Sequence, residues 1–254
     1  MSAVLKVAGL TKAYGRFRAL DGVAFEMLKS DVLAVIGPNG AGKSTCFNLI
    51  GGQLRPDAGT IHLEGRDITG LAPSRICRFG LGRTFQIPAS FGSFSVLENV
   101  QLAMIAAAGE MHRLWTRANR LHRDAVLALL ERVGMADQAA RPCGLLAYGD
   151  LKRVELAIAL AQSPRLLLMD EPTAGMAPAE RADFMESCIK LALQGGSAVL
   201  FTEHDMDVVF RHAGRVLVLD RGQVIAEGSP AEVADNDKVR EVYLGQDFTQ
   251  LGRT

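Results

Sequence analysis

A glycine-rich segment carries the clearest chemistry in the sequence. Residues 37–45 fit the pattern G-x-x-x-x-G-K-[ST] of a phosphate-binding loop. Glycines let the backbone curl so that successive N–H groups point at phosphate oxygens. Lys43 would bring a full positive charge to the β- and γ-phosphates, and the Ser44 hydroxyl suits Mg²⁺. The pattern predicts a nucleoside triphosphate site formed by Gly37, Pro38, Asn39, Gly40, Ala41, Gly42, Lys43, Ser44 and Thr45.

Two carboxylates follow an apolar run later in the chain. Residues 166–169 lead directly into Asp170 and Glu171. A buried parallel strand delivers such residues to its C-terminal end, where ligands bind in open α/β sheets. Asp170 suits Mg²⁺, directly or through water, and Glu171 is placed to polarise an attacking water. The alternative is an ordinary strand exit without chemistry.

A histidine follows the next apolar strand. His204 comes directly after a run that ends in Thr202-Glu203. In that place it could reach a γ-phosphate, and its alternative is a surface-loop histidine. His62, His112, His122 and His212 have no such context, and we interpret them as structural or exposed.

A mostly parallel sheet is needed to hold these residues. Apolar runs at 32–36, 165–170 and 197–202 predict buried strands, and residues 46–50 predict a helix that stops at Gly51-Gly52. Short strands within 4–31 and at 59–65 predict an antiparallel sheet beside this core. Strands alternating with helices indicate an α/β fold.

The middle of the chain reads as a helical insert over residues 90–160. Ser95 and Glu98 form a capping box that starts one helix. A second helix has Val126, Leu129, Leu130 and Val133 on one face, and a third runs from about Asp150 to Gln162. An amphipathic helix from Pro178 and a second capping box at 229–232 follow later.

The composition narrows the class of protein. The chain has 254 residues, 48% hydrophobic and 22% charged, with 28 Lys+Arg against 28 Asp+Glu. This zero net charge gives no indication of wholesale nucleic-acid binding. The scattered cysteines 46, 77, 143 and 188 predict reduced, buried thiols of a cytoplasmic protein. No signal peptide and no apolar run of ~18 residues is present, so no membrane span is predicted.

Together these motifs resemble the ATP-binding subunits of ABC transporters over nearly the full chain. Residues 37–45 match Walker A, 166–171 match Walker B, and residues 146–150 stand at the signature motif. The resemblance implies catalytic roles for Glu171, His204 and the Q-loop residue Gln86. It implies that Tyr14 stacks on adenine, and that Mg²⁺ is held by Ser44, Gln86 and Asp170. ATP would be closed between two subunits, with Ala147, Tyr148 and Gly149 contacting the nucleotide across the interface.

The resemblance also implies an architecture. We expect a P-loop NTPase (RecA-like) core with an antiparallel β subdomain and a helical subdomain, all within one ABC ATPase domain spanning 1–254. The core lobe would comprise residues 1–88 and 161–254, and the helical subdomain about 89–160.

A closer similarity is to the ATPase subunits of branched-chain (hydrophobic) amino acid importers. It depends on residues 146–149, 171–176 and 242–245 and on an enlarged insertion at 105–125. The similarity implies a second ATPase subunit in a heterodimer, two permease subunits contacted by residues 87–100, and a substrate-binding protein. It also implies a peripheral location on the cytoplasmic face of the bacterial inner membrane.

Three positions depart from the family pattern. Ala147 replaces a serine, Asp150 replaces a glutamine, and Ala177 stands where many relatives have Asp or Asn. Asp150 suits helix capping. Asp150 and Ala177 together also leave open a regulatory nucleotide-binding subunit with one slow composite site. A third reading, an ABC protein acting on nucleic acid or ribosomes, is disfavoured because the chain has a single cassette and no long coiled-coil insert.

A basic cluster falls within the insertion. It comprises His112, Arg113, Arg117, Arg120, His122 and Arg123, with Trp115 among them. We interpret it as a solvated helix face, the alternative being contact with lipid head groups or the permease.

Overall fold

Two sheets form the frame of the molecule. The computed structural model describes residues 3–84, 90–110 and 121–243. The larger sheet has the strand order β10-β9-β3-β8-β7-β6. Its strands are β3 (Val32–Ile36), β6 (Leu81–Thr84), β7 (Leu166–Asp170), β8 (Ala198–Thr202), β9 (Arg215–Asp220) and β10 (Gln223–Gly228). Adjacent strands pair in parallel, except that β10 runs antiparallel to β9.

The central strands are apolar on both faces because both faces are covered. All five residues of β8 are buried, as are four of the five in β7. In the parallel register Asp170 lies opposite Thr202, and Val35 also pairs with Thr202. The three loops that leave β3, β7 and β8 therefore begin at one edge of the sheet, as the sequence predicted.

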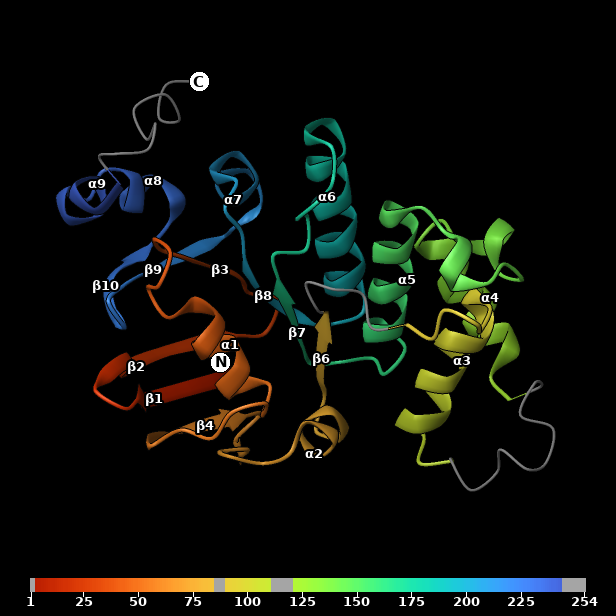
Figure 1. Cartoon of the computed structure of the whole chain (residues 1–254), viewed down its shortest axis with the longest axis horizontal. Helices are drawn as coiled ribbons and strands as arrows, with labels where there is room; N and C mark the ends of the chain where they lie inside the picture. The colour runs from red at the N-terminus through yellow and green to blue at the C-terminus, as the bar shows by residue number, and fades with distance from the viewer. Residues whose placement is uncertain (1–2, 85–89, 111–120, 244–254) are drawn as a thin grey trace.

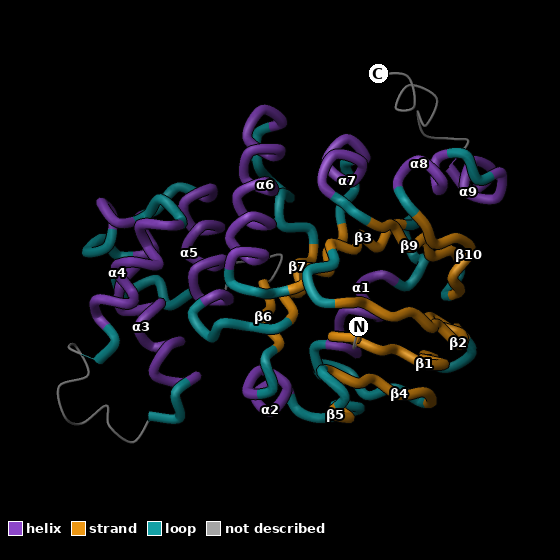
Figure 2. The backbone as a smooth tube through the Cα atoms, turned by 180° about the vertical axis from the view of Figure 1, so that it is seen from behind, coloured by secondary structure: helices purple, strands orange, loops and turns teal. Residues whose placement is uncertain are grey.

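A four-stranded antiparallel sheet lies beside this core. Its order is β2-β1-β4-β5, formed by β1 (Ala3–Tyr14), β2 (Phe17–Leu28), β4 (Ala58–Leu63) and β5 (Arg66–Asp67). The first two strands are each 12 residues long, so the expectation of short strands within 4–31 was wrong there. Helix α1 (Lys43–Ile50) lies between the two sheets (Figure 2). It starts at Lys43, three residues earlier than the apolar run indicated.

The insert between β6 and β7 is helical. It contains α3 (Val96–Ala107), α4 (Arg123–Arg132), two short 3₁₀ turns (Ala136–Gln138 and Cys143–Leu145) and α5 (Tyr148–Leu160). The Ser95–Glu98 capping box is confirmed, and Val126, Leu129, Leu130 and Val133 are all buried. These helices stand together at one side of the large sheet (Figure 1). The predicted α/β fold with an antiparallel sheet and a helical insert is confirmed.

The remaining helices complete the layers. They are α2 (Pro73–Arg78), α6 (Pro178–Gln194), α7 (Met206–His212), α8 (Pro230–Ala234) and α9 (Asp237–Tyr243). The inward face predicted for α6 is buried, and the Ser229–Glu232 capping box is formed. All four cysteines are free thiols, but Cys77 is only half-buried because it lies on the partly exposed α2. Within the described ranges, none of the helices combines the length and apolarity needed to cross a bilayer.

Candidate nucleotide-binding site

The glycine-rich loop joins β3 to α1 with backbone angles that need glycine. Gly42, at the start of α1, has φ +107°, and Gly40 has φ +81°. A Cβ on Gly42 would lie 2.5 Å from the Ala19 carbonyl oxygen, and a Cβ on Gly37 would collide with the Leu219 carbonyl oxygen. The loop is thus packed against backbone on two sides. Its curl is fixed by the fold, which leaves the N–H groups at the start of α1 available to an anion.

Lys43 is held inside this curl. Its ammonium donates to the carbonyl oxygens of Gly37 at 2.6 Å and Pro38 at 3.2 Å. Only 7% of the residue is exposed, and burial lowers its pKa while Glu171 and Asp170 oppose that shift. A buried cation facing two carboxylates is suited to the charged tail of a nucleotide.

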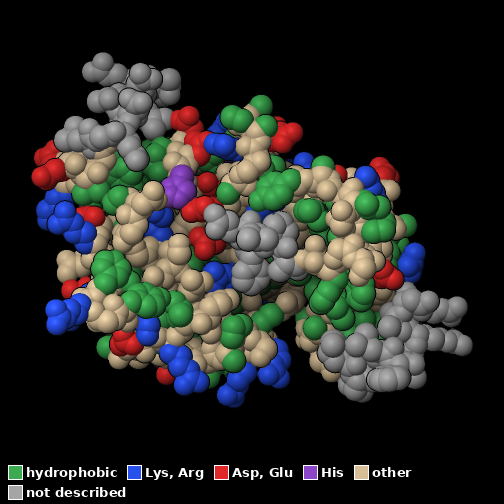
Figure 3. Space-filling model, in the orientation of Figure 1, with side chains coloured by type: hydrophobic (Ala, Val, Ile, Leu, Met, Phe, Trp, Pro, Cys, Tyr) green, Lys and Arg blue, Asp and Glu red, His purple; other side chains and the backbone are tan. Residues whose placement is uncertain are grey.

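One pocket gathers most of the predicted site residues. It is lined by Tyr14, Phe17, Ala19, the loop residues Asn39 to Thr45, Glu171 and His204. Two of the lining residues are exposed aromatics, Tyr14 at 49% and Phe17 at 60%. Figure 3 shows a histidine beside acidic side chains on one face of the molecule. The pocket therefore pairs an apolar wall with a phosphate-binding loop, which is the arrangement a nucleotide requires.

Asp170 is oriented by two neighbours. Its Oδ1 accepts a 2.8 Å hydrogen bond from the Thr202 hydroxyl on β8. Its Oδ2 lies 3.7 Å from Nη2 of Arg83 on β6. The register of the sheet explains the first contact, because Asp170 and Thr202 are paired positions.

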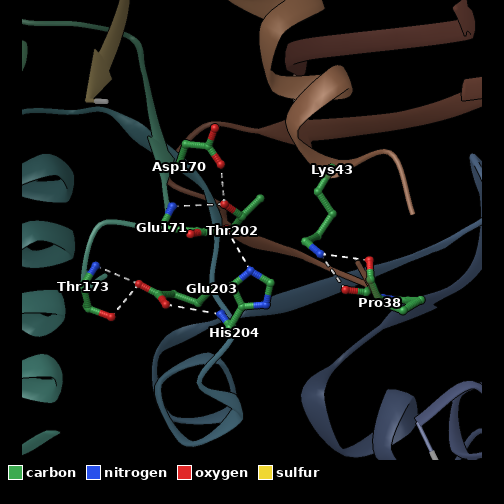
Figure 4. A network of polar contacts seen from close by, with 9 residues as sticks. Pro38, Lys43, Asp170, Glu171, Thr173, Thr202, Glu203 and His204 are labelled. Carbon is green, nitrogen blue, oxygen red and sulfur yellow. Dashed lines mark hydrogen bonds and ion pairs between the residues drawn. The ribbon is translucent and has the colours of Figure 1, made fainter. Parts of the chain in front are cut away.

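The side chains of Glu171 and His204 are in direct contact. Nε2 of His204 lies 2.7 Å from Oε1 of Glu171 (Figure 4). Glu171 has φ +49°, a strained conformation for a non-glycine residue. Its N–H donates to both the carbonyl and the hydroxyl of Thr202. The backbone therefore turns sharply after β7 and carries the Glu171 side chain toward the histidine.

A buried carboxylate clamps the segment that follows Glu171. Glu203 is 4% exposed, and its Oε1 accepts from the N–H of Thr173 at 2.9 Å and from the Thr173 hydroxyl at 2.7 Å. Oε2 accepts from the N–H of His204 at 3.3 Å. Burial raises the pKa of Glu203, while these hydrogen bonds pull the pKa back down. Figure 4 shows Glu203 bridging the two segments.

A second tie joins the same two segments. Arg181 on α6 donates from Nε to the carbonyl of Met176 at 3.1 Å, and its Nη1 contacts Oδ2 of Asp205 at 3.1 Å. Residues 171–177 and 203–205 are therefore linked at two points, so the relative positions of Glu171 and His204 are constrained.

The donors present fit a magnesium ion. Asp170 supplies a carboxylate, and Ser44, which is exposed at the start of α1, supplies a hydroxyl. Within the described residues there is no group of three or more His, Cys, Asp or Glu able to hold a metal. Mg²⁺ in nucleotide sites typically uses one or two such protein oxygens plus phosphate oxygens, so this sparse set is appropriate.

The signature residues occupy a different surface. Ala147 is the N-cap of α5, and Tyr148 and Gly149 form its first turn. None of them lines the pocket described above. They lie beside the segment after Glu171: a Cβ on Gly175 would sit 3.0 Å from Cε1 of Tyr148, and one on Gly149 would sit 4.0 Å from Cε of Met176. One chain thus brings the loop, Tyr14, Asp170, Glu171 and His204 together and leaves the signature elsewhere.

The departures from the family pattern have local explanations. Asp150 is the third residue of α5, not its cap, and its Oδ2 accepts a 2.9 Å hydrogen bond from Nε2 of Gln138. The capping role expected for its side chain was therefore wrong, although a carboxylate in the first turn still favours the helix. Ala177 is the N-cap of α6 and forms no side-chain cap.

Several expected features lie outside the described residues. Gln86 is one of them, as are His112, Arg113, Trp115, Arg117 and Arg120. Of the basic cluster the structure describes His122, whose Nε2 lies 2.9 Å from Oε2 of Glu110, and Arg123 at the start of α4.

Sequence reasoning missed four residues at the site. Phe17 lines the pocket together with Tyr14. Thr202 and Arg83 contact Asp170, and Glu203 accepts hydrogen bonds from Thr173. The only signal for Phe17 was an aromatic near the turn that follows Tyr14. Thr202 and Glu203 were visible as polar residues at the end of an apolar strand.

Comparison with known protein families assigns the class. The ABC transporter family model matches residues 20–174, and a model for the branched-chain amino acid ATP-binding cassette transporter matches residues 223–249. The chain belongs to the ABC transporter family, and it is an ATP-binding ATPase of that family. The resemblance inferred from the motifs and the expected ABC ATPase architecture are confirmed.

Among individual proteins, the chain is similar to ATP-binding proteins of branched-chain amino acid transport. The chain is 35% identical over 250 residues to the high-affinity branched-chain amino acid transport ATP-binding protein BraF of Pseudomonas aeruginosa, covering 96% of this chain and 98% of BraF. It is equally similar, at 35%, to LivG of Salmonella typhimurium, with the same coverage.

Solved structures agree with this assignment. A nucleotide-free ATP-binding cassette from an ABC transporter superposes with a TM-score of 0.84 at 33% identity, covering 95% of this chain and 99% of that one. A dimeric ATP-binding cassette, MJ0796, in a post-hydrolysis state with ADP and Pi, gives a TM-score of 0.75 at 26% identity, covering 89% and 98%.

Proposed function

We propose that this chain hydrolyses ATP to drive import of branched-chain or related amino acids. The observation that carries the catalytic part is the 2.7 Å contact between Glu171 and His204, in the pocket that also contains Lys43. Glu171 polarises the attacking water, and His204 orients Glu171 and faces the γ-phosphate. Gln86 is assigned the third catalytic role from its place in the motif pattern.

The nucleotide is held at both ends. Residues 37–45 surround the phosphates, and Lys43 exchanges loop carbonyls for phosphate oxygens. Tyr14 stacks on the adenine. Mg²⁺, when bound by Ser44, Asp170 and Gln86, would neutralise charge on the phosphates.

The site needs a second subunit to be complete. Ala147, Tyr148 and Gly149 lie outside the pocket, and the first turn of α5 presents backbone N–H groups. In a closed pair these groups contact the γ-phosphate bound by the partner, so closure depends on ATP and hydrolysis releases it. The dimeric cassette with ADP and Pi supports this arrangement. We assign the pair as a heterodimer with a second ATPase subunit.

The solute and the remaining partners come from the relatives. BraF and LivG are described as branched-chain amino acid transport ATP-binding proteins. We assign two permeases and a substrate-binding protein to the complex, with this chain on the cytoplasmic face of the bacterial inner membrane. Phe91 and Phe94, exposed at 58% and 42% with ring centroids 5.3 Å apart, support residues 87–100 as the permease contact.

We also assign two lobes within the one domain of 1–254. Residues 1–88 and 161–254 form the core lobe, and about 89–160 the helical subdomain. The sheet-bound position of the loop, Asp170, Glu171 and His204 supports placing the hydrolytic groups on the first lobe.

The catalytic assignment is tested with Glu171→Gln. We expect ATP binding to be retained and turnover of the assembled transporter to fall at least ~100-fold, because the general base is lost. Glu131→Gln on the exposed face of α4 is the matched control and should leave both unchanged. Unchanged turnover in Glu171→Gln would show that Glu171 is not the base. Uptake of labelled leucine by vesicles containing the permeases then tests the solute.

A further inference from the structure

Arg83 is a partly buried cation with partners in three parts of the chain. It stands on β6, and 9% of its side chain is exposed. Its Nη1 donates to the Phe47 carbonyl at 3.1 Å and to Oε1 of Gln53 at 2.6 Å, and its Nη2 donates to Oδ1 of Asn48 at 2.8 Å. Nη2 also lies 3.7 Å from Oδ2 of Asp170. A planar guanidinium can hold several acceptors in one fixed geometry, which an ammonium cannot.

These contacts connect the phosphate-binding helix to the carboxylate strand. Phe47 and Asn48 are in α1, whose first turn carries Lys43 and Ser44. A positive charge near the last carbonyls of a helix is favourable, so Arg83 also stabilises the C-terminal end of α1. The space for this contact is provided by Gly51, where a Cβ would lie 2.5 Å from Nη1 of Arg83.

The two carboxylate oxygens of Asp170 have different neighbours. Oδ1 is fixed by the Thr202 hydroxyl at 2.8 Å, and Oδ2 faces the guanidinium. The carboxylate is thereby held in one orientation at the end of β7.

We propose that Arg83 is a positioning residue that sets the Ser44 hydroxyl against the Asp170 carboxylate for Mg²⁺. Ser44 and Asp170 belong to different elements, and Arg83 is bonded to the helix of one and in contact with the side chain of the other. The inference rests on the proposed function only in taking Ser44 and Asp170 as the ligands of the metal.

The test separates position from charge. Mg²⁺ is titrated into the full chain with a fluorescent ATP analogue, and analogue binding is also measured in EDTA. Arg83→Lys keeps the positive charge and loses the planar guanidinium group with its several N–H donors. We expect both Arg83→Lys and Arg83→Gln to raise the Mg²⁺ concentration that gives half-maximal analogue binding by at least about tenfold. Binding of the analogue in EDTA should change less than twofold. Arg78→Lys is the control, since Arg78 is exposed on α2 and donates to the Ser74 carbonyl.

Other outcomes overturn the inference. If Arg83→Lys requires the same Mg²⁺ concentration as the wild type, the guanidinium group has no positioning role. If metal-free and Mg²⁺-dependent binding fall together, Arg83 supports folding only. Should Arg83→Lys not fold, Asn48→Ala removes one partner; an unchanged Mg²⁺ titration there refutes the proposal, and a shift of about threefold supports it. A wild-type chain whose analogue binding ignores Mg²⁺ would instead contradict the proposed function.

Discussion

Replacement of Thr173 by valine tests whether Glu203 holds together the two segments that carry Glu171 and His204. Thr173 is 1% exposed, and its hydroxyl donates to Oε1 of Glu203 at 2.7 Å. Valine has nearly the same shape, so the main change is the loss of one hydrogen bond to a buried carboxylate. Hydrogen bonds to charged groups contribute about 1.5–3 kcal/mol, and that is the expected loss in the free energy of unfolding.

The loss should depend on pH, because the Thr173 hydroxyl lowers the pKa of Glu203. Without it, the pKa of Glu203 rises further above its ordinary value of 4.5. A carboxyl whose pKa is raised by folding loses stability as pH rises through that raised pKa. The deficit of Thr173→Val should therefore be largest well above the raised pKa, and should shrink as the pH falls toward 4.5.

Urea unfolding of both chains at about pH 8 and about pH 5 provides the measurement. Thr84→Val is the matched control, because Thr84 is buried and its hydroxyl makes no hydrogen bond within the described part of the chain. Because this buried hydroxyl has no hydrogen bond to lose, its removal should not lower stability at either pH. The role of Glu203 would be refuted if Thr173→Val lowered the free energy of unfolding by less than about 0.5 kcal/mol at pH 8, or by the same amount at both pH values.

Three further predictions concern the pocket and the core. Tyr14→Ala and Phe17→Ala should each weaken ATP binding about 5- to 150-fold, because stacking on the base contributes ~1–3 kcal/mol. Binding of tripolyphosphate, measured by competition, should stay unchanged. If ATP and tripolyphosphate binding weakened equally, stacking would be excluded. Gly42→Ala should cost at least about 1–3 kcal/mol of stability and abolish ATP binding, since its φ is +107°; normal melting and binding would contradict this. Burial lowers the pKa of His212 below 6.5, so stability should fall as pH drops through 6.5. His212→Gln should flatten that fall in urea titrations between pH 7 and about 5; an unchanged slope would show that His212 is not responsible.

The sequence predicted those parts of the site that a single short segment determines. The loop at 37–45 needs glycine where its backbone has a positive φ, and the spacing of these glycines can be read from the sequence. The apolar run before Asp170 indicated a strand, and the strand end places the carboxylate. The position of His204 was predictable in the same way, because the carboxyl ends of parallel strands lie at one edge of the sheet.

The parts that were missed are contacts between distant segments. Arg83 and Asp170 are separated by the whole helical insert, and only the pairing of β6 with β7 brings them close. Asp150 was expected to cap its helix, but the fold offers it Gln138 instead. Glu203 shows the same limit: its polarity was plain from the sequence, whereas its partner Thr173 depends on the turn after Glu171. Partner identity is a tertiary property that local patterns do not encode.

The turn at Glu171 shows how the fold stabilises a strained position that is proposed to be catalytic. A non-glycine residue at φ +49° costs of order 1–3 kcal/mol. The Glu171 N–H offsets part of this by donating to both the carbonyl and the hydroxyl of Thr202, which the register of β7 and β8 places opposite Asp170. The Thr202 hydroxyl in turn donates to Asp170. One threonine thus supports the carboxylate proposed for Mg²⁺ and the backbone of the proposed general base. Because of that shared support, Thr202→Val should affect both groups at once, more than the loss of either contact alone.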